Sequence, residues 1–375
     1  MKKLILCSFV FAFLWGSLGC ASTPTVLQAG TPTSPPDEYD SFSTAMPNDS
    51  ARLPVTWSQL DLSGRLIYAI GGVDANNNYD VQIHRLNLTD GIVNVLYRAP
   101  IGGNIYYTSV SRDGQRLAMS YSPPSGSDPN VVQGIYVMSA DGLATPQLLF
   151  TPPTPQDQYT QVEWSPDGQY VYCTHVNYVL PDDDNNRVTP LYTIYRMHYP
   201  DGQLELVAEQ AFWPRLSPDG SRLVYVSIDP LSEEQELQLA DADGQNSHAV
   251  PLSGPYIPEE KSAPLFAPDG KSLLFSGNVE GESYLPNLWD RLAGVTPVRA
   301  DDENSDWWSV PIEGGKITKL TNIRHAGLYA SPSPDRMFLA IFSKDNIFAM
   351  RPDGTDLTVL LGGLRGFPGT ITWVP

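Results

Sequence analysis

Ser217-Pro218-Asp219-Gly220, followed by the alternating run Arg222-Leu223-Val224-Tyr225-Val226, is the stretch of sequence that decides the fold. Its first four residues form a phrase that recurs at intervals of about 50 residues. Each copy follows an apolar residue and precedes another strand-like run. Turn residues at fixed offsets in a repeat of this length predict repeated all-β units. The other copies are Ser111-Arg112-Asp113-Gly114, Ser165-Pro166-Asp167-Gly168, Ala267-Pro268-Asp269-Gly270 and the degenerate Ser333-Pro334-Asp335-Arg336.

A second phrase, mostly built on Asp-Gly, follows the first within each unit, after an insertion of variable length. Asp-Gly between alternating apolar runs is a strong hairpin signal, because both residues tolerate the φ > 0 conformations of tight turns. The two phrases together divide each unit into four strands. The copies are Leu88-Thr89-Asp90-Gly91, Ser139-Ala140-Asp141-Gly142, Tyr199-Pro200-Asp201-Gly202, Asp241-Ala242-Asp243-Gly244, Ile312-Glu313-Gly314-Gly315 and Arg351-Pro352-Asp353-Gly354.

A single four-stranded antiparallel sheet leaves both of its faces in need of cover. Several such sheets packed around an axis bury those faces, which is the arrangement of a β-propeller. We therefore predict an all-β, six-bladed β-propeller of four-stranded antiparallel blades over residues 54–375. The six second strands are Arg65-Leu66-Ile67-Tyr68, Arg116-Leu117-Ala118-Met119, Tyr170-Val171-Tyr172, Arg222-Leu223-Val224-Tyr225, Ser272-Leu273-Leu274-Phe275 and Met337-Phe338-Leu339-Ala340.

The two ends of the repeat region predict how the ring closes. Thr370-Ile371-Thr372-Trp373-Val374-Pro375 reads like Gln161-Val162-Glu163-Trp164-Ser165-Pro166, an inner strand whose turn is cut off. Ser63-Gly64-Arg65 reads like the other half of that turn. We expect the C-terminal strand to complete the first blade. The alternative inner strand, Val55-Thr56-Trp57-Ser58, needs a longer turn.

The alternating SPDG and ADG turns resemble the repeats of the TolB-type propeller family, over roughly residues 60 to 375. The resemblance implies the propeller fold and little about function, since the family includes binding platforms, fused regulatory domains and enzymes. The namesake of the family carries an additional N-terminal α/β domain, which we do not expect in this chain.

The N-terminus has the character of a secretory leader. Two lysines, the apolar run Leu4 to Leu18 and Gly19-Cys20 predict a signal peptide over residues 1–19 and lipidation of Cys20. The match to a lipoprotein cleavage site is imperfect at Ser17. An ordinary signal peptide cleaved nearby and an uncleaved anchor therefore stay open as alternatives.

Residues 20–53 are rich in Thr, Pro, Ser and Ala and lack apolar periodicity, so they predict a disordered tether. We expect a monomeric, extracytoplasmic lipoprotein, periplasmic or at the cell surface. Its contact with the membrane would be through the lipid anchor only.

The net charge and the cysteine content indicate which partners and which covalent links to expect. The formal net charge is −19, and an acidic protein without basic clusters is a poor candidate for nucleic acid, so we expect no nucleic-acid partner. Once Cys7 is removed and Cys20 is acylated, Cys173 has no partner. We expect no disulfide, and we expect Cys173 to be a small buried hydrophobe.

Strand order places both turns of every blade on one side of the ring, which we call the Asp-Gly face. Connections between second and third strands, and between blades, lie on the other side, which we call the long-loop face. Length variation on one face of a repeat protein is typical of a binding surface. The insertions are Gly71 to Tyr79, Ser122 to Gln133, His175 to Thr189, Asp229 to Glu234 and Gly277 to Asp306.

Two of these insertions carry oxygen ligands on alternate residues, which is the pattern by which one loop supplies several ligands to calcium. Neither matches the full calcium loop, because the central Gly and terminal Glu are missing. A calcium site is one interpretation, and solvated loops without a cofactor are the other. The candidate ligands are Asp74, Asn76, Asn78 and Asp80 in the first insertion and Asp182, Asp184 and Asn186 in the second.

Aromatic and histidine side chains on the long-loop face are the candidate ligand contacts, since exposed aromatics beside Asn and Asp suit a sugar or a peptide. We expect Trp164 and Trp213 to be packed between blades. Of the pair Trp307-Trp308, one ring should face the core and the other the adjoining loop. The candidate contacts are Trp289, Tyr178, Tyr284, His175 and His325.

No catalytic residue is assigned. The chain has no Gly-x-Ser-x-Gly elbow, which excludes the propeller-plus-peptidase arrangement. Its five histidines are scattered, although His175 and His325 fall near the long-loop face. We expect a non-enzymatic platform that binds a protein or glycan of the cell envelope. The alternative is a hydrolase or lyase with an axial His/carboxylate metal site.

Overall fold

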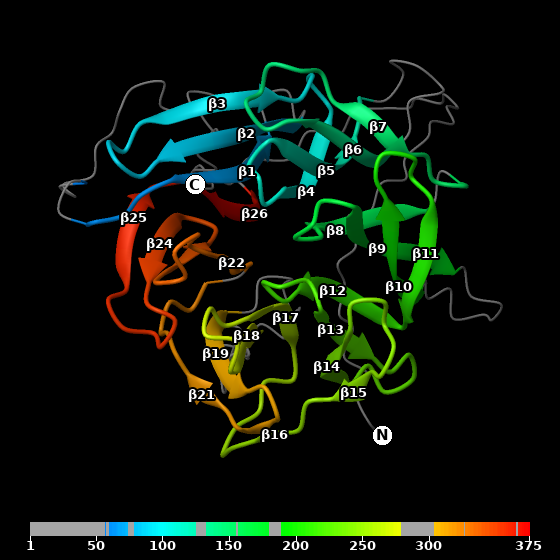
Figure 1. Cartoon of the computed structure of the whole chain (residues 1–375), viewed down its shortest axis with the longest axis vertical. Coiled ribbons are helices and arrows are strands. Elements are labelled where there is room, and N and C mark those ends of the chain that lie inside the picture. Colours follow the sequence, from blue (N-terminus) through cyan, green and yellow to red (C-terminus); the bar gives the residue numbers. More distant parts are fainter. Residues whose placement is uncertain are drawn as a thin grey trace, which may run out of the picture.

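The computed structural model describes residues 57, 60–73, 79–124, 133–154, 157–179, 189–278, 304–325, 327–364 and 367–375. Its blades stand around a central axis, and each is a four-stranded antiparallel sheet (Figure 1). The predicted all-β fold with six blades is confirmed. Among the described residues there is no α-helix, and hence none that could cross a membrane.

Each blade runs from an inner strand at the axis to an outer strand at the rim. Blade 1 contains β26 (Phe367–Val374), β1 (Arg65–Val73), β2 (Tyr79–Asn87) and β3 (Val93–Arg98). Blade 2 contains β4 (Asn104–Val110), β5 (Arg116–Ser122), β6 (Gly134–Ser139) and β7 (Gln147–Phe150). Blade 3 contains β8 (Gln158–Trp164), β9 (Tyr170–Val179), β10 (Thr189–His198) and β11 (Leu204–Glu209).

The other three blades have the same order. Blade 4 contains β12 (Ala211–Leu216), β13 (Arg222–Ile228), β14 (Gln235–Asp241) and β15 (His248–Ala249). Blade 5 contains β17 (Lys261–Phe266), β18 (Ser272–Asn278), β19 (Ser305–Pro311) and β21 (Thr318–Lys319). Blade 6 contains β22 (Tyr329–Pro332), β23 (Leu339–Phe342), β24 (Asn346–Met350) and β25 (Thr358–Gly362). The short strands β16 (Leu252–Ser253) and β20 (Gly315–Lys316) pair in parallel and link blades 4 and 5.

The C-terminal strand closes the ring, as predicted. β26 pairs with β1 in antiparallel register, with Trp373 opposite Leu66 and Ile371 opposite Tyr68. Arg65 adds a hydrogen bond from its Nε to the carbonyl oxygen of Pro375 at 2.9 Å. The first blade is therefore built from both ends of the repeat region.

Trp57, which belongs to the alternative inner strand, has a different role. Its indole is buried in the apolar cluster between blades 6 and 1, together with Leu88 and Trp373. Gly91 lies so close to this indole that a Cβ at that position would collide with it. Trp57 thus packs between blades 6 and 1, next to the strand pair that closes the ring.

The first phrase of the repeat is a turn in which each residue has its own contact. Ser165 donates its hydroxyl to Asp167 (2.6 Å) and accepts the N–H of Tyr170 (2.9 Å). Gly168 takes the left-handed conformation, with φ 68°, that favours glycine. In the degenerate copy Arg336 adopts φ 65° in its place. The local chemistry of the turn therefore explains why the phrase recurs.

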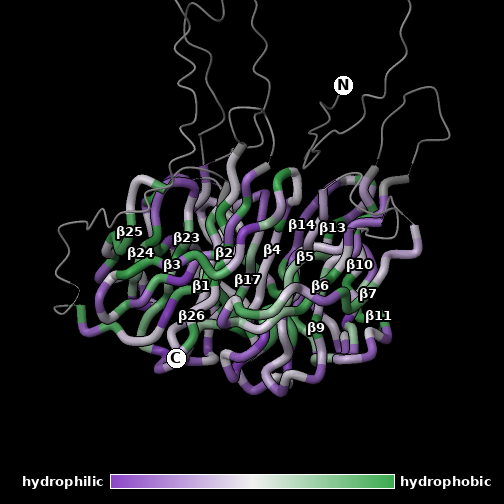
Figure 2. The backbone as a smooth tube through the Cα atoms, turned by 90° about the horizontal axis from the view of Figure 1, so that it is seen from above, coloured by the Kyte–Doolittle hydropathy of each residue, from purple (hydrophilic) through white to green (hydrophobic). Residues whose placement is uncertain are grey.

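The glycine of the second phrase is required by close approach between neighbouring blades. Gly202 of blade 3 lies against the carbonyl oxygen of Leu149 in blade 2, and Gly244 of blade 4 lies against that of Val207 in blade 3. A Cβ at either position would overlap the carbonyl. These contacts hold the turns in place on the Asp-Gly face, on whose side the C-terminus lies in Figure 2.

Both faces of a blade are buried, which explains the consecutive apolar residues of its middle strands. Trp307 packs toward blade 6 and Trp308 toward blade 4, and both rings are buried. The Trp308 ring also packs against Tyr256 in the connection before β17, with centroids 5.9 Å apart, so one of the two rings faces a loop as expected, although that ring is buried. Trp164 is buried between blades 2 and 3, as expected. Cys173 is a buried free cysteine, and burial raises the pKa of its thiol.

Candidate functional site

The axis of the ring is filled by aromatic side chains of the inner strands. Tyr107 of blade 2, Trp213 of blade 4 and Tyr329 of blade 6 occupy the same place in the repeat, four residues before the position of the first turn. The ring centroids of Trp213 lie 5.4 Å from those of Tyr107 and 5.5 Å from those of Tyr329, and the two tyrosines are 6.2 Å apart. Aromatic pairs attract at such separations. Alternate blades thus contribute the three large rings, and we call this set the axial aromatic layer.

Three inner strands have a β-bulge at this repeat position. Gln161, Trp213 and Ala263 share the repeat position and have φ values of 53°, 60° and 46°. The pairing register of β8, β12 and β17 shifts at the same places. A bulge inserts one unpaired residue and redirects the side chain. Of the three axial rings, Trp213 stands on such a bulge, and the Gln161 side chain accepts the N–H of Trp213 at 2.8 Å.

Next to the axial aromatic layer lies a largely buried ion pair between blades 3 and 4. Arg215 Nη1 is 2.8 Å from Glu163 Oε2, and Ser109 donates its hydroxyl to the same oxygen at 3.3 Å. Burial raises the pKa of Glu163, while Arg215 and Ser109 oppose the rise. Arg215 also donates to the carbonyl oxygen of Ala330 in blade 6, at 3.4 Å. The pair therefore joins four blades at the axis.

On the Asp-Gly side, Arg112 departs from the repeat, since the four other copies of the phrase have proline there. Its Nη1 donates to the carbonyl oxygen of Pro218 at 3.0 Å and so links the turns of blades 2 and 4. The aromatic layer, the ion pair and this arginine together occupy the axis from the middle of the inner strands to the Asp-Gly face.

His175 lies toward the long-loop end of β9, and a carboxylate orients its imidazole. Its Nε2 is 2.8 Å from Asp157 Oδ1, and the ring stacks on Tyr159 with centroids 4.8 Å apart. Thr154 donates its N–H and its hydroxyl to Asp157 Oδ2, at 3.0 and 2.8 Å. Burial disfavours the ionised carboxyl, but the bonds from His175 and Thr154 outweigh it and lower the pKa of Asp157. The histidine side chain is 15% exposed.

His325, the second histidine of the predicted axial site, lies between blades 5 and 6. Its Nδ1 is 3.2 Å from the Ser343 hydroxyl, and its carbonyl oxygen accepts the N–H of Ser305 at 3.2 Å. No group of three His, Cys, Asp or Glu side chains that could hold a metal occurs among the described residues. Within that part of the chain, His175 and His325 belong to separate hydrogen-bond networks.

Of the predicted calcium ligands, Asp80 lies in the described part of the chain, at the start of β2. Its carboxylate forms an ion pair with Arg98 (3.3 Å). Arg98 also contacts the Gln82 carboxamide, whose other end reaches His84 Nε2 at 3.0 Å. Asp80 is thus the outer member of a polar chain along blade 1.

The other sequence candidates fall mostly outside the described residues. Tyr178 lies in β9 opposite Pro190, close to the long-loop end of the strand. The lipidation residue, two aromatic contacts and six calcium ligands are not covered: Cys20, Tyr284, Trp289, Asp74, Asn76, Asn78, Asp182, Asp184 and Asn186. The assignments made for them stay predictions.

We expect acid to destabilise the fold through His84. Burial, together with Arg98, lowers the pKa of His84 to about 4 from its ordinary 6.5. The unfolded chain takes up the proton first, so the stability that the neutral histidine contributes is fully present above pH 6.5. It is lost as the pH falls toward 4, by about 3 kcal/mol.

Urea unfolding across this pH range measures the effect. His84→Phe is the control, because it keeps a ring against Tyr68, whose centroid is 5.4 Å away, but cannot ionise. The variant should lose less stability on acidification than the wild type. Equal slopes for the two proteins would contradict the assignment.

The axial aromatic layer is the part of the site that sequence reasoning missed. A signal for it exists, since an aromatic residue stands four places before the first turn in every second repeat. Trp213 was expected between blades; it contacts the clusters on both sides of blade 5's inner strand but belongs to the axis.

Solved structures with this fold include a TolB and part of a hydrazine synthase. TolB from Acinetobacter baumannii has a TM-score of 0.55 at 16% identity, covering 83% of this chain and 67% of that one. Hydrazine synthase from Kuenenia stuttgartiensis has a TM-score of 0.57 at 10% identity, covering 84% of this chain and 46% of that one. At these identities the similarity shows the fold alone. No known family profile and no curated protein matches the sequence.

Proposed function

We propose that the protein is an extracytoplasmic, lipid-anchored propeller that binds a protein or glycan of the cell envelope on its long-loop face. The observation that carries the proposal is the closed axis beneath that face. Among the described residues, the rings of Tyr107, Trp213 and Tyr329 are in contact and fill the axis at their level. A face with loops of variable length above a filled axis suits a macromolecular partner better than a small substrate.

Two described residues on this face support a protein partner. Leu231 is 95% exposed at the tip of the connection between β13 and β14. Asp229 holds that tip by accepting the N–H groups of Leu231 (2.9 Å) and Ser232 (2.8 Å). Ile101, between blades 1 and 2, is 72% exposed. Aliphatic side chains held in water on ordered turns are suitable interface contacts, although single ones also occur on ordinary surfaces.

The anchor part of the proposal rests on the sequence. A signal peptide ending at Gly19, acylation of Cys20 and a polar tether would hold the propeller near a membrane while leaving both of its faces accessible. In this arrangement the tether, and not the propeller, determines the distance from the bilayer.

Site-specific photo-crosslinking in the native envelope tests which face binds. We expect a photoreactive residue at position 231 or 101 to capture a discrete partner, and Leu231→Asp with Ile101→Asp to weaken its binding at least tenfold. Met337 on the Asp-Gly face is the matched control position, being 51% exposed. The Cys20→Ala protein serves as the unanchored form.

Equal capture from position 337, or unchanged binding by the doubly substituted protein, would contradict a long-loop binding face. A hydrolase or lyase is the second candidate, and the imidazole of His175 oriented by Asp157 favours it. Conversion of a bound glycan or peptide that disappears in His175→Gln would replace the first proposal by this one.

A further inference from the structure

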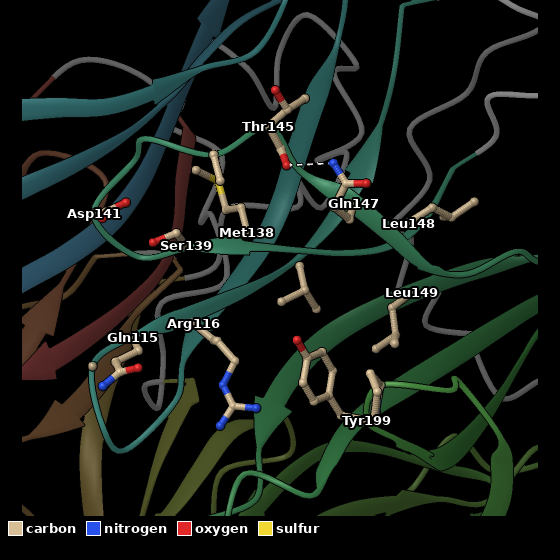
Figure 3. A pocket seen from close by; sticks show the side chains of 14 residues that line it. Gln115, Arg116, Met138, Ser139, Asp141, Thr145, Gln147, Leu148, Leu149 and Tyr199 are labelled. Atoms are coloured by element: carbon tan, nitrogen blue, oxygen red, sulfur yellow. Dashed lines mark hydrogen bonds between the residues drawn. The ribbon is translucent and has the colours of Figure 1, made fainter.

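A cleft of about 670 Å³ opens between blades 2 and 3 near the Asp-Gly face (Figure 3). Blade 2 forms one wall with β5, β6 and β7, and the second turn of blade 3 forms the other. A volume of several hundred Å³ is typical of small-molecule sites. The residues that matter most are Arg116, Val137, Ser139, Gln147, Leu149 and Tyr199.

The cleft results from a local departure from the repeat. In the second turn of blade 3 the N–H of Gly202 reaches back to His198, four residues away, whereas in blade 2 Gly142 bonds to Ser139, three residues away. Tyr199 occupies the position that Ala140 has in blade 2, since each donates its N–H to the first turn of its own blade. Blade 1 has the same longer turn, with Leu88 at this position, so the large ring of Tyr199 is what distinguishes blade 3. Such departures are expected where a repeat acquires a function.

Arg116 supplies a positive charge at the lower end of the cleft in Figure 3. Its guanidinium carbon lies 4.9 Å from the centroid of Tyr199 and 5.1 Å from that of Trp164, so two rings fix its orientation. Asp113 is its ion-pair partner, at a long 3.5 Å, and the other oxygen of Asp113 accepts the hydroxyl of Ser111. The arginine side chain is 31% exposed. It has donors left for an anion.

The rest of the wall is mainly apolar. Figure 3 shows Leu149 and Tyr199 facing the same space as Arg116. Gln147 uses its amide on the Thr145 carbonyl oxygen, at 3.1 Å. Asp141 lies across the cleft from Tyr199, and its carboxylate accepts the N–H of Leu143 at 2.9 Å. The cleft thus offers a cation at one end and an aliphatic and aromatic wall beyond it.

We propose that this cleft binds an aliphatic monocarboxylate, with the carboxylate on Arg116 and the hydrocarbon chain along Val137, Leu149 and Tyr199. A peptide fits less well, because its amide groups would need partners that an apolar wall does not supply. The carbonyl oxygen of Leu149 is also covered by Gly202. The site lies near the face opposite the long-loop surface and is independent of the function proposed for that surface.

Calorimetric titration of the mature protein with decanoate, and with decanol as the uncharged probe, tests the proposal. We expect decanoate to bind at one site and decanol to bind at least tenfold more weakly. Arg116→Gln should weaken decanoate at least tenfold and leave decanol unchanged. Arg222→Gln is the matched control, since Arg222 has the same repeat position in blade 4.

A second variant keeps the test decisive if Arg116→Gln does not fold. Gln147→Trp adds bulk to an exposed wall position and should abolish decanoate binding without touching the core. No binding of decanoate, or binding that both variants leave unchanged, would overturn the proposal. Tighter binding of N-acetyl-leucyl-leucine than of decanoate would also overturn it, in favour of a peptide carboxyl terminus.

Discussion

Deletion of residues 370–375 is expected to open the ring and abolish cooperative unfolding near the wild-type melting temperature. These residues form most of β26, which supplies the inner strand of blade 1. Ile371, Trp373 and Val374 are buried in it, each contributing roughly 1.5–3 kcal/mol. Their sum approaches the whole stability of an ordinary domain. Thr370 also bonds to Thr108 and so joins blade 1 to blade 2.

Thermal unfolding followed by circular dichroism, with size-exclusion chromatography, measures the effect of the deletion. We expect an expanded protein with a broad transition. Removal of Pro375 alone is the control, because it lies beyond β26 and contributes mainly its carbonyl oxygen to Arg65. A melting temperature unchanged by the six-residue deletion would mean that another segment, such as Val55-Thr56-Trp57-Ser58, can supply the inner strand.

The fold could be predicted because its information is local. Ser165, Asp167 and Gly168 make contacts within one turn, and the same contacts recur at Ser217, with a hydroxyl bond of 2.6 Å to Asp219. Because each turn depends mainly on its own residues, the same sequence phrase recurs from repeat to repeat. Counting the repeats predicts the number of blades, and the missing half-turn at the C-terminus predicts how the ring closes.

Contacts between blades could not be predicted in the same way. The axial aromatic layer depends on which inner-strand residues reach the centre, and Trp308 is buried against side chains of the preceding blade. The cleft between blades 2 and 3 depends on the ring of Tyr199, whose importance appears only when Arg116 is placed beside it. Sequence positions indicate such departures from the repeat, but the neighbouring blade decides what they form.

Replacing Arg215 by methionine is expected to cost about 3 to 5 kcal/mol of folding free energy. The guanidinium lies 2.8 Å from Glu163, and the two side chains are only 22% and 16% exposed. Burial already raises the pKa of Glu163 above its ordinary value. Without the arginine, the carboxylate keeps the hydroxyl of Ser109 as a donor but loses the opposite charge. Few other single substitutions in this ring should have a comparable effect.

The pH dependence of this loss of stability shows whether it comes from the unpaired charge of Glu163 or from lost packing of Arg215. A carboxyl whose pKa is raised in the folded state destabilises folding when ionised, and protonation relieves the cost as the pH falls. Loss of Arg215 raises the pKa of Glu163 further, so the deficit of Arg215→Met should be smaller at about pH 5 than at about pH 8. Glu163→Gln in the same background removes the buried charge and should restore part of the stability at the higher pH. Urea unfolding of the four proteins at both pH values measures these differences. A deficit that is independent of pH, with no recovery in the double variant, would mean that the arginine acts by packing.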